Sequence, residues 1–243
     1  EPLVRPAILT AFLGDSVVAC LLLVDLGRAE NFWHPLVMWN IHSVMFEITW
    51  CIICYSTVLL LEFAPVVLEK FNLKAPIKFL KIISIPIVIA GVLFSTLHQS
   101  SFGSLYLIVP GKLHQLWYSS LLPVHFFISC VAAGLSMIIF ESYLIARSCT
   151  KEEGFCNTGL KMNILSGASF VVLIALITGL LLKIYDFVSN DKLIYLTIPS
   201  METSLFYLEI IIGTIVPIYL LSYKKFREDK KWLYIISICV ISG

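Results

Sequence analysis

The stretch MNILSGASFVVLIALITGLLL, residues 162–182, contains no charged side chain and is long enough to cross a lipid bilayer. Because lipid offers no hydrogen-bond partners, a spanning backbone must pair its amides within its own segment, which predicts an α-helix. Comparable apolar runs lie near residues 6–26, 36–61, 79–97, 121–146, 162–188, 204–221 and 232–243. The sequence therefore predicts an all-α polytopic transmembrane helix bundle with about seven helices.

The composition of the chain excludes an ordinary soluble domain. Of its 243 residues, 59% are hydrophobic and 14% are charged, whereas a soluble domain carries about 25% charged residues. The formal net charge of +1 gives no basis for binding nucleic acid. We expect one integral membrane domain over residues 1–243. Because the chain begins at Glu1 and stops inside an apolar run, we expect both termini to be incomplete.

The basic residues indicate how the chain is oriented in the membrane. With the N-terminus inside, most of the 17 Lys and Arg residues fall in the inner segments. Those segments are residues 1–5, 62–81, 147–161 and 222–231. The basic residues left on the outer side are Arg28, Lys112, Lys183 and Lys192. The positive-inside rule therefore predicts that the N-terminus lies inside.

All five histidines fall in the outer half of the predicted bundle. They are His34, His42, His98, His114 and His125. Ionisable groups near lipid are costly and usually functional, so the outer face is the expected location of the chemistry.

Several polar residues are expected at one outer cavity. Asp25 and Arg28 close the first predicted helix, and His98 and Gln99 close the third. Asn40 and His42 open the second. A quinone headgroup would suit such a cavity, because its carbonyls need hydrogen-bond donors and its reduction takes up protons. The alternative is an interfacial Asp25–Arg28 ion pair with His98 as a helix cap.

A second set of acids lies deeper in the predicted helices. Those expected well inside the bilayer are Asp15, Glu47 and Glu209, and those toward the inner ends are Glu62 and Glu141. Asn40 and Glu47 are spaced to share one helix face. The acids could form a proton path from the inner side to the outer site. Alternatively, each acid is neutral and hydrogen-bonded between helices.

Other patterns are less specific. The segment 98–120 is expected to be a long connection, part of which dips into the outer leaflet. Cys51 and Cys54 form a C-x-x-C motif without a second pair, so no metal or iron–sulfur site is expected. The inner half has no histidine, which excludes two stacked haems. One outer haem on His42 and His125 stays open.

Seven stretches read together as a family pattern. They are PLVRPAIL (2–9), VDLGR (24–28), NIHSVMFE (40–47), LLEFAP (60–65), STLHQSSFGSLYL (95–107), KLHQLWYSSLLP (112–123) and MIIFES (137–142). With them the chain resembles the NrfD/polysulfide-reductase family of membrane subunits. It resembles most of all the branch that anchors periplasmic nickel–iron hydrogenases of the hydrogenase-2 type.

The resemblance implies a haem-free subunit, a fragment of a bundle of eight to ten helices, that exchanges electrons with menaquinone or ubiquinone. Its implied partners are a periplasmic ferredoxin-like iron–sulfur subunit and a catalytic subunit, such as a nickel–iron hydrogenase, a molybdoenzyme or a multihaem cytochrome. The implied location is the cytoplasmic membrane of a bacterium or archaeon, with the quinone site toward the periplasm.

The resemblance also implies site residues. His98 and Asp25 match positions close to the quinone pocket, and Glu47 and Glu141 match intramembrane acids. Asp15 departs from the pattern, which has a neutral residue there, so its proton role is inferred from the residue alone. Three alternatives to a quinone-reactive subunit stay open: a haem-binding anchor, a transporter without redox chemistry, and a purely structural anchor.

Overall fold

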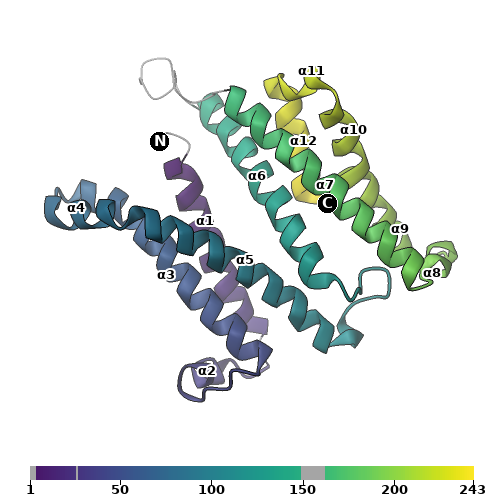
Figure 1. The fold of residues 1–243 in the computed structure, drawn as a ribbon, viewed down its shortest axis with the longest axis horizontal. Helices are drawn as coiled ribbons and strands as arrows, with labels where there is room; N and C mark the ends of the chain where they lie inside the picture. The colour runs from purple at the N-terminus through teal and green to yellow at the C-terminus, as the bar shows by residue number, and fades with distance from the viewer. Residues whose placement is uncertain (1–3, 26, 149–161) are drawn as a thin grey trace. The chain divides into compact units, whose positions relative to one another are not determined.

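The computed structural model of the chain describes residues 4–25, 27–148 and 162–243. Every regular element within these ranges is helical, which confirms the predicted all-α class. The helices, labelled in Figure 1, form two compact units. The first unit ends at Leu105, and the second runs from Tyr106 to Gly243. A single membrane domain over residues 1–243 stays a prediction.

The first unit contains three long helices. Its elements are α1 (Val4–Asp25), the 3₁₀ helix η1 (Ala29–Asn31), α2 (His34–Val37), α3 (Val44–Lys70), α4 (Lys74–Ile82) and most of α5 (Ser84–Ile108). α1 packs along α3, where Phe12 stacks on Phe63 with 5.8 Å between ring centroids. Val58 of α3, Leu80 of α4 and Ile87 of α5 form a buried apolar core.

The helix predicted over residues 79–97 is interrupted at Ile83. Residues 74–82 form the separate helix α4, and α5 begins at Ser84. Pro86 lies in the first turn of α5, a position where its missing N–H costs no helical hydrogen bond. The prediction missed this break because apolar residues continue across it.

The helix α5 continues to Ile108, so the prediction that His98 closes a helix and that 98–120 is a connection was wrong. The polar residues after His98 find partners without leaving the helix. Ser101 Oγ donates to Glu47 Oε1 over 2.6 Å, and Ser104 Oγ donates to the Ser100 carbonyl over 3.2 Å. Because these hydroxyls are satisfied, the helix does not end where its sequence turns polar.

The second unit is a bundle of longer helices joined by short ones. Its elements are η2 (Pro110–Lys112), α6 (Leu122–Ser148), α7 (Met162–Ser189), α8 (Leu193–Thr197), α9 (Met201–Leu208), the π-helical segment η4 (Glu209–Ile215), α10 (Val216–Ser222), α11 (Lys224–Arg227) and α12 (Lys230–Ser242). α6 packs against both α7 and α12. Leu116, Phe187 and Phe206 form a buried apolar core.

The π-helical segment η4 interrupts the last long span and has an identifiable cause. Pro217 has no N–H, and in a regular helix its ring would collide with the carbonyl of Gly213. The turn before it is widened, so that the Val216 amide donates to the carbonyl of Ile211. Wide turns of this kind occur frequently at functional sites, and this one begins at Glu209.

Six helices of the described residues are long and apolar enough to cross a bilayer. They cover Ala7–Val24, Val44–Lys70, Ser84–Ile108, Leu122–Arg147, Met162–Ser189 and Met201–Ser222. Many of their large apolar side chains face outward, as expected for helices in contact with lipid. The seventh predicted run forms α12, which has 13 residues where about 20 are needed. A seventh span therefore stays a prediction.

Candidate functional site

His98 is buried among the helices of the first unit. It lies in the middle of α5 and is 4% exposed. Its Nδ1 atom lies 4.0 Å from Oδ1 of Asp15, which comes from α1 and is 8% exposed. This is an ion-pair distance, longer than the 2.7–3.2 Å of a direct N–H···O hydrogen bond. A buried imidazole and a buried carboxylate therefore face each other inside an apolar bundle.

A third helix holds the carboxylate of Asp15 in place. Ser56 of α3 donates its hydroxyl hydrogen bond to Oδ2 of Asp15, the oxygen that does not face His98. Each of α1, α3 and α5 thus contributes one polar side chain to the same cluster. Because unpaired polar groups are costly away from water, this cluster ties the three helices together.

The other ring nitrogen of His98, Nε2, is buried and has no hydrogen-bond partner among the described residues. The ring is flanked by Phe102, with 4.7 Å between ring centroids, and by Tyr55, at 6.0 Å. Leaving a buried polar atom unpaired costs about 1–3 kcal/mol. An unpaired nitrogen between aromatic rings is the arrangement expected where a ligand supplies the missing partner.

Glu47 contributes a second carboxylate to the first unit. It lies in the first turn of α3 and accepts the hydrogen bond from Ser101, one turn beyond His98 on α5. Glu47 itself is exposed, whereas Cys51, one turn further along α3, is buried. The helices α3 and α5 therefore carry polar side chains at two levels. Glu47 meets Ser101 at one level, and Ser56 and His98 both contact Asp15 at the other.

In the structure the carboxylate that faces His98 belongs to Asp15, whereas Asp25 is the acid expected with His98 at one outer cavity. Both Asp15 and Asp25 belong to α1, and ten residues of helix separate them by about 15 Å along the axis. Since Asp15 faces His98, the backbone of Asp25 lies almost three turns away. The side chain of Asp25 falls outside the described part of the chain. Spacing could not reveal this pairing, because it depends on how α1 and α5 pack.

The other predicted quinone-site residues lie mostly on the connection between α1 and α3. Arg28, Asn40 and His42 are exposed, while Gln99 is half-buried beside His98 on α5. Asn40 and His42 precede α3, so the prediction that they open this helix and that Asn40 shares its face with Glu47 was wrong. The Asn40 side chain instead accepts the backbone N–H of His42 over 3.2 Å, a local turn that competes with helix formation.

Glu209 of the second unit has two partners. Its Oε1 atom lies 2.8 Å from Nζ of Lys183 on α7, and its Oε2 accepts a 2.6 Å hydrogen bond from the indole of Trp117. The Lys183 and Glu209 side chains are 31% and 26% exposed. Sequence reasoning proposed Glu209 but assigned no partner to it, although Lys183 is a charged residue inside an otherwise apolar run.

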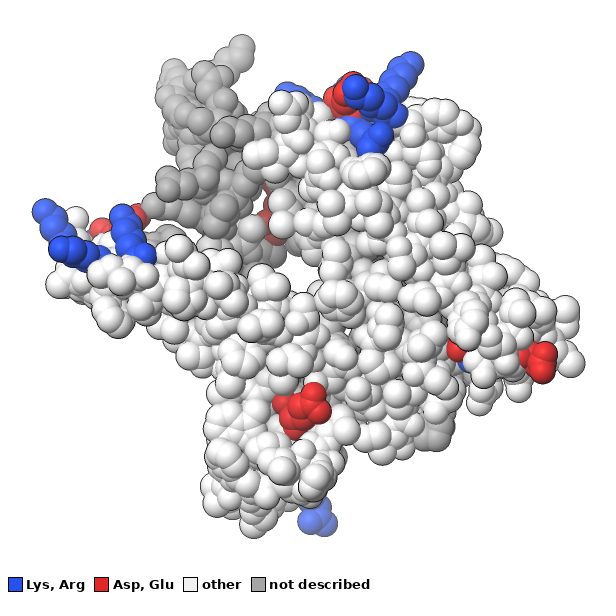
Figure 2. Space-filling model, in the orientation of Figure 1, with Lys and Arg blue, Asp and Glu red and all other residues white. Residues whose placement is uncertain are grey.

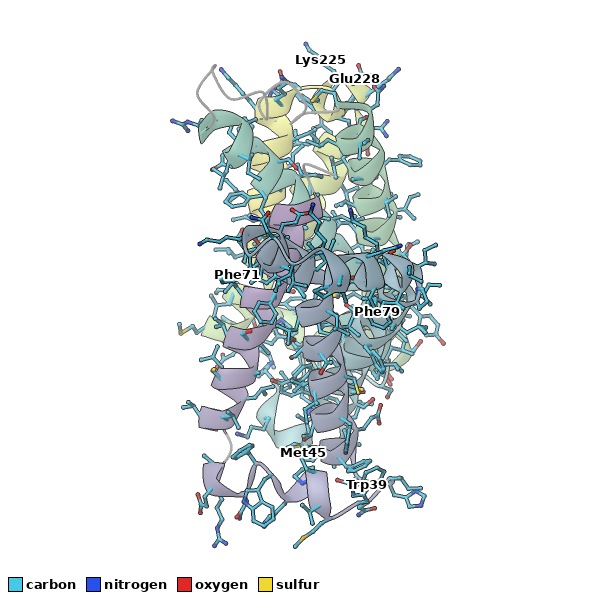
Figure 3. The ribbon with its side chains drawn as sticks, turned by 90° about the vertical axis from the view of Figure 1, so that its left-hand side faces the viewer. Trp39, Met45, Phe71, Phe79, Lys225 and Glu228 are labelled. Carbon is cyan, nitrogen blue, oxygen red and sulfur yellow. The ribbon has the colours of Figure 1, made fainter. Side chains whose placement is uncertain are left out.

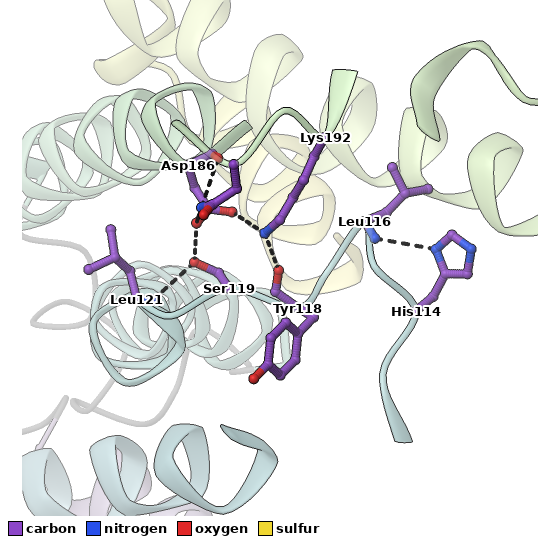
Figure 4. A network of polar contacts seen from close by, with 8 residues as sticks. His114, Leu116, Tyr118, Ser119, Leu121, Asp186 and Lys192 are labelled. Atoms are coloured by element: carbon purple, nitrogen blue, oxygen red, sulfur yellow. Dashed lines mark hydrogen bonds and ion pairs between the residues drawn. The ribbon is translucent and has the colours of Figure 1, made fainter. Parts of the chain in front are cut away.

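A second ion pair in this unit is almost completely buried from solvent. Nζ of Lys192 lies 2.7 Å from Oδ2 of Asp186, and the two side chains are 9% and 6% exposed. As Figure 4 shows, Lys192 also donates to the Tyr118 carbonyl, and Ser119 donates to the other oxygen of Asp186. The network fixes the segment before α6 against the end of α7. Sequence analysis did not identify this network, because Lys192 was used only as an orientation signal and Asp186 was not singled out.

Glu141, another of the predicted acids, lies on α6 in the second unit. Its Oε1 atom is buried and has no hydrogen-bond partner among the described residues.

The same unit contains a cavity of about 410 Å³, lined mainly by apolar residues. The polar side chains at its wall include Trp117, His125, Lys183 and Glu209.

Metal-binding groups are sparse in the described ranges. No group of three or more His, Cys, Asp or Glu residues there could hold a metal ion. Cys51 is buried and Cys54 half-buried on α3, both with free thiols. His42 is exposed in the first unit, and His125 is half-buried in the second. The absence of haem and iron–sulfur clusters from this chain stays a prediction.

Comparison with known proteins identifies relatives along the whole chain. Residues 2–243 match the family model described as Polysulphide reductase, NrfD. A probable Ni/Fe-hydrogenase 2 b-type cytochrome subunit of Escherichia coli is 29% identical over 100% of this chain. A menaquinone reductase integral membrane subunit of Nitratidesulfovibrio vulgaris is 29% identical over 45% of it. Another protein of N. vulgaris is 49% identical over 58% of it.

The chain is shorter than these relatives. The match covers 61% of the E. coli protein and 28% of the menaquinone reductase subunit. It covers 37% of the other N. vulgaris protein. No solved structure gives a significant match.

Proposed function

This chain belongs to the polysulphide reductase NrfD family, and we propose that it is the quinone-reactive membrane subunit of a respiratory oxidoreductase complex. In this role it passes electrons between a periplasmic iron–sulfur subunit and menaquinone or ubiquinone. The names of two relatives support the proposal: one is a subunit of a menaquinone reductase, and the other is a b-type cytochrome subunit of a hydrogenase.

The observation that carries the proposal is the unpartnered Nε2 atom of buried His98, backed by Asp15 on the other side of the ring. A quinone carbonyl can accept a hydrogen bond from Nε2 when the ring is protonated. A quinol hydroxyl can donate to Nε2 when the ring is neutral. The flat rings of Phe102 and Tyr55 beside His98 suit an aromatic headgroup.

The proton and electron balance assigns a specific task to His98. Oxidation of a quinol releases two electrons and two protons. In the proposed step, His98 takes one hydroxyl proton at Nε2, and the negative charge of Asp15 stabilises the resulting imidazolium. The electrons pass to oxidised iron–sulfur clusters of the partner, which are thereby reduced. Quinone reduction follows the reverse course.

The second oxygen of the headgroup needs its own partner. For it we propose Gln99, beside His98 on α5, and four residues at the outer end of the first unit, which are Asp25, Arg28, Asn40 and His42. Asp25 would act as a proton donor or acceptor, and the others would shape and polarise the pocket.

Protons must also travel between the quinone and the aqueous phases. We propose that Asp15 and Glu47 serve this purpose in the first unit, and Glu141 and Glu209 in the second. The contacts of Ser56 with Asp15 and of Ser101 with Glu47 support the first pair, because hydroxyls can both donate and accept a proton. Net proton translocation is the corresponding further step of the proposal.

The proposed partners follow from the electrons that quinone chemistry exchanges. Reduction of a quinone requires an electron source, which we propose to be a ferredoxin-like iron–sulfur subunit. That subunit would be joined to a nickel–iron hydrogenase, a molybdoenzyme or a multihaem cytochrome. The proposed setting is the cytoplasmic membrane of a bacterium or archaeon, with the quinone site toward the periplasmic face.

The proposal is tested by His98→Ala in the assembled complex. Quinone turnover should fall by about 10²–10⁴-fold, the usual contribution of a general acid–base group, while the subunits still copurify. His98→Gln, which keeps a donor but cannot exchange protons, should lose turnover to a similar extent. The matched control is His114→Ala, which removes an exposed histidine of the second unit and should leave turnover unchanged. Wild-type turnover in an assembled His98→Ala complex would remove His98 from the mechanism.

A further inference from the structure

The chain reverses direction sharply after α3, and this turn positions the short helix α4. Asn72 adopts a left-handed backbone conformation with φ of 54°, which asparagine tolerates better than most residues. The Leu73 amide then donates to the carbonyl of Leu68 over 3.2 Å, closing the end of α3. With nine residues, α4 is far too short to cross a bilayer.

One face of α4 anchors it to the first unit. Leu80 is 8% exposed and joins Val58 of α3 and Ile87 of α5 in the buried core. Because the turn at Asn72 fixes one end and Leu80 fixes the middle, the remaining faces of α4 are held in defined directions.

A second face of α4 carries positive charge. Lys74, Lys78 and Lys81 follow the i, i+4, i+7 spacing that places side chains on one side of a helix. All three are exposed, and none forms an ion pair with a carboxylate of the described residues. Figure 2 shows Lys and Arg side chains gathered over α4, with smaller patches of acidic side chains beside them.

A third face of α4 is apolar and largely exposed. Phe79 is 62% exposed and Ile82, one turn further, is 71% exposed. Phe71, in the preceding turn, is 66% exposed, and Figure 3 shows it apart from Phe79, as a second exposed aromatic side chain. Exposed aromatic and aliphatic side chains next to a row of lysines are the pattern of helices that lie in the membrane interface.

From this arrangement we propose that α4 lies flat on the bilayer surface and binds anionic phospholipids. Its lysines contact the phosphates of the headgroups, and Phe79 and Ile82 insert among the acyl chains. The long lysine stems reach the headgroup level while their ammonium groups stay hydrated. This lipid site is independent of the proposed redox function.

The second unit also has a basic segment, residues 224–231, which differs from α4 because it contains acidic residues as well. There, Lys224 lies 3.5 Å from Glu228, and Asp229 caps the next helix. Carboxylates interleaved with lysines weaken attraction to an anionic surface, whereas α4 itself contains no acidic residue between its lysines. Charge complementarity therefore favours α4 as the site for anionic lipid.

The test compares lipid binding to the purified full chain by native mass spectrometry, using phosphatidylglycerol and phosphatidylcholine with identical acyl chains. One lysine near an anionic surface contributes about fivefold to binding, so the wild type should prefer phosphatidylglycerol at least tenfold. The triple variant K74Q/K78Q/K81Q should bind the two lipids within about twofold of each other. Because these lysines are exposed, the variant should keep its helical circular dichroism spectrum.

Two further variants sharpen the test. The matched control K224Q/K225Q/K230Q removes the same charge from the second unit and should keep most of the preference. F79S/I82S should weaken binding of both lipids while the preference remains.

The proposal is overturned if K74Q/K78Q/K81Q keeps the preference of the wild type, or if the control triple variant loses as much. It is also overturned if millimolar inorganic phosphate or a soluble acidic peptide displaces the lipid, since α4 would then recognise free anions or an acidic protein partner.

Discussion

His98 and Asp15 face each other across 4.0 Å, measured from Nδ1 to Oδ1, although they come from different helices. Both side chains are buried, so water and salt screen their interaction weakly. The imidazole and the carboxylate therefore interact strongly inside the bundle, whatever the imidazole binds at Nε2.

Asp15→Asn should lower quinone turnover of the assembled complex by about 10–100-fold, less than the loss of a general base itself. Asparagine keeps the size of the side chain and can still accept the Ser56 hydrogen bond, but it cannot stabilise a charged imidazolium. Steady-state quinone kinetics would measure the effect. Asp229→Asn, at an exposed helix cap, is the control and should leave turnover unchanged. Unaltered kinetics in Asp15→Asn would restrict Asp15 to a structural role.

Ser56→Ala should destabilise the first unit by about 1–3 kcal/mol, because it leaves a buried carboxylate oxygen without its donor. Unfolding by SDS in mixed micelles provides the measurement. In a double-mutant cycle with Asp15→Ala, which removes the acceptor, the coupling energy should exceed about 0.5 kcal/mol. The control Ser129→Ala removes an exposed hydroxyl that bonds within its own helix and should have little effect. Strictly additive changes would show that Ser56 and Asp15 do not act as a pair.

Glu209→Gln should destabilise the second unit by about 2–4 kcal/mol, since it leaves Lys183 charged and unpaired within a membrane span. The double variant Lys183→Met/Glu209→Gln should recover most of that loss, because it removes both charges. The Trp117 indole donates to Glu209, so tryptophan emission should also change in Glu209→Gln. A double variant less stable than the single one would contradict this account of the pair.

Lys192→Met should cost about 3–5 kcal/mol of unfolding free energy, because Asp186 would remain charged in a nearly dry site. The reference is Lys224→Met, which breaks an exposed pair whose side chains are 79% and 57% exposed. Exposed pairs of this type contribute little, so its unfolding midpoint should not move. Equal effects of the two variants would mean that the Asp186–Lys192 network does not hold the end of α7.

The purified chain should show no b-type α band in a reduced-minus-oxidised visible spectrum. The prediction follows from the histidine count, because all five histidines fall in the outer half of the predicted bundle. It is informative because one relative is named a b-type cytochrome subunit. An α band that disappears in His42→Ala or His125→Ala would establish a haem and replace the proposed haem-free mechanism.

The course of the helices could be predicted largely from apolar run length, whereas several of their ends could not. The prediction ended the third helix before His98, because the sequence turns polar there. The helix continues because Ser101 and Ser104 find partners on α3 and on the preceding turn. Conversely, the break at Ile83 lies within apolar sequence, where hydropathy carries no signal and Pro86 is the only local indication.

The composition of the site was predictable, but its pairing was not. His98, Asp15 and Glu47 stand out as ionisable residues in apolar runs, which is a property of the sequence. Asp15 rather than Asp25 faces His98 because α1 and α5 align at that level, which depends on packing between distant segments. Hydroxyl partners such as Ser56 are still harder to foresee, since serine is common in these helices.

The placement of Asp15 also has a mechanical consequence for α1. The outer surface of this helix is almost uniformly apolar, with Val17 57% and Leu21 62% exposed, so contact with hydrocarbon hardly resists a vertical slide. A displacement by one helical turn, about 5.4 Å, would withdraw the carboxylate from the serine and the imidazole together. Together with the Phe12–Phe63 stack, this acidic side chain thus fixes the height of α1 against α3, as a single polar residue sets the register of a coiled coil.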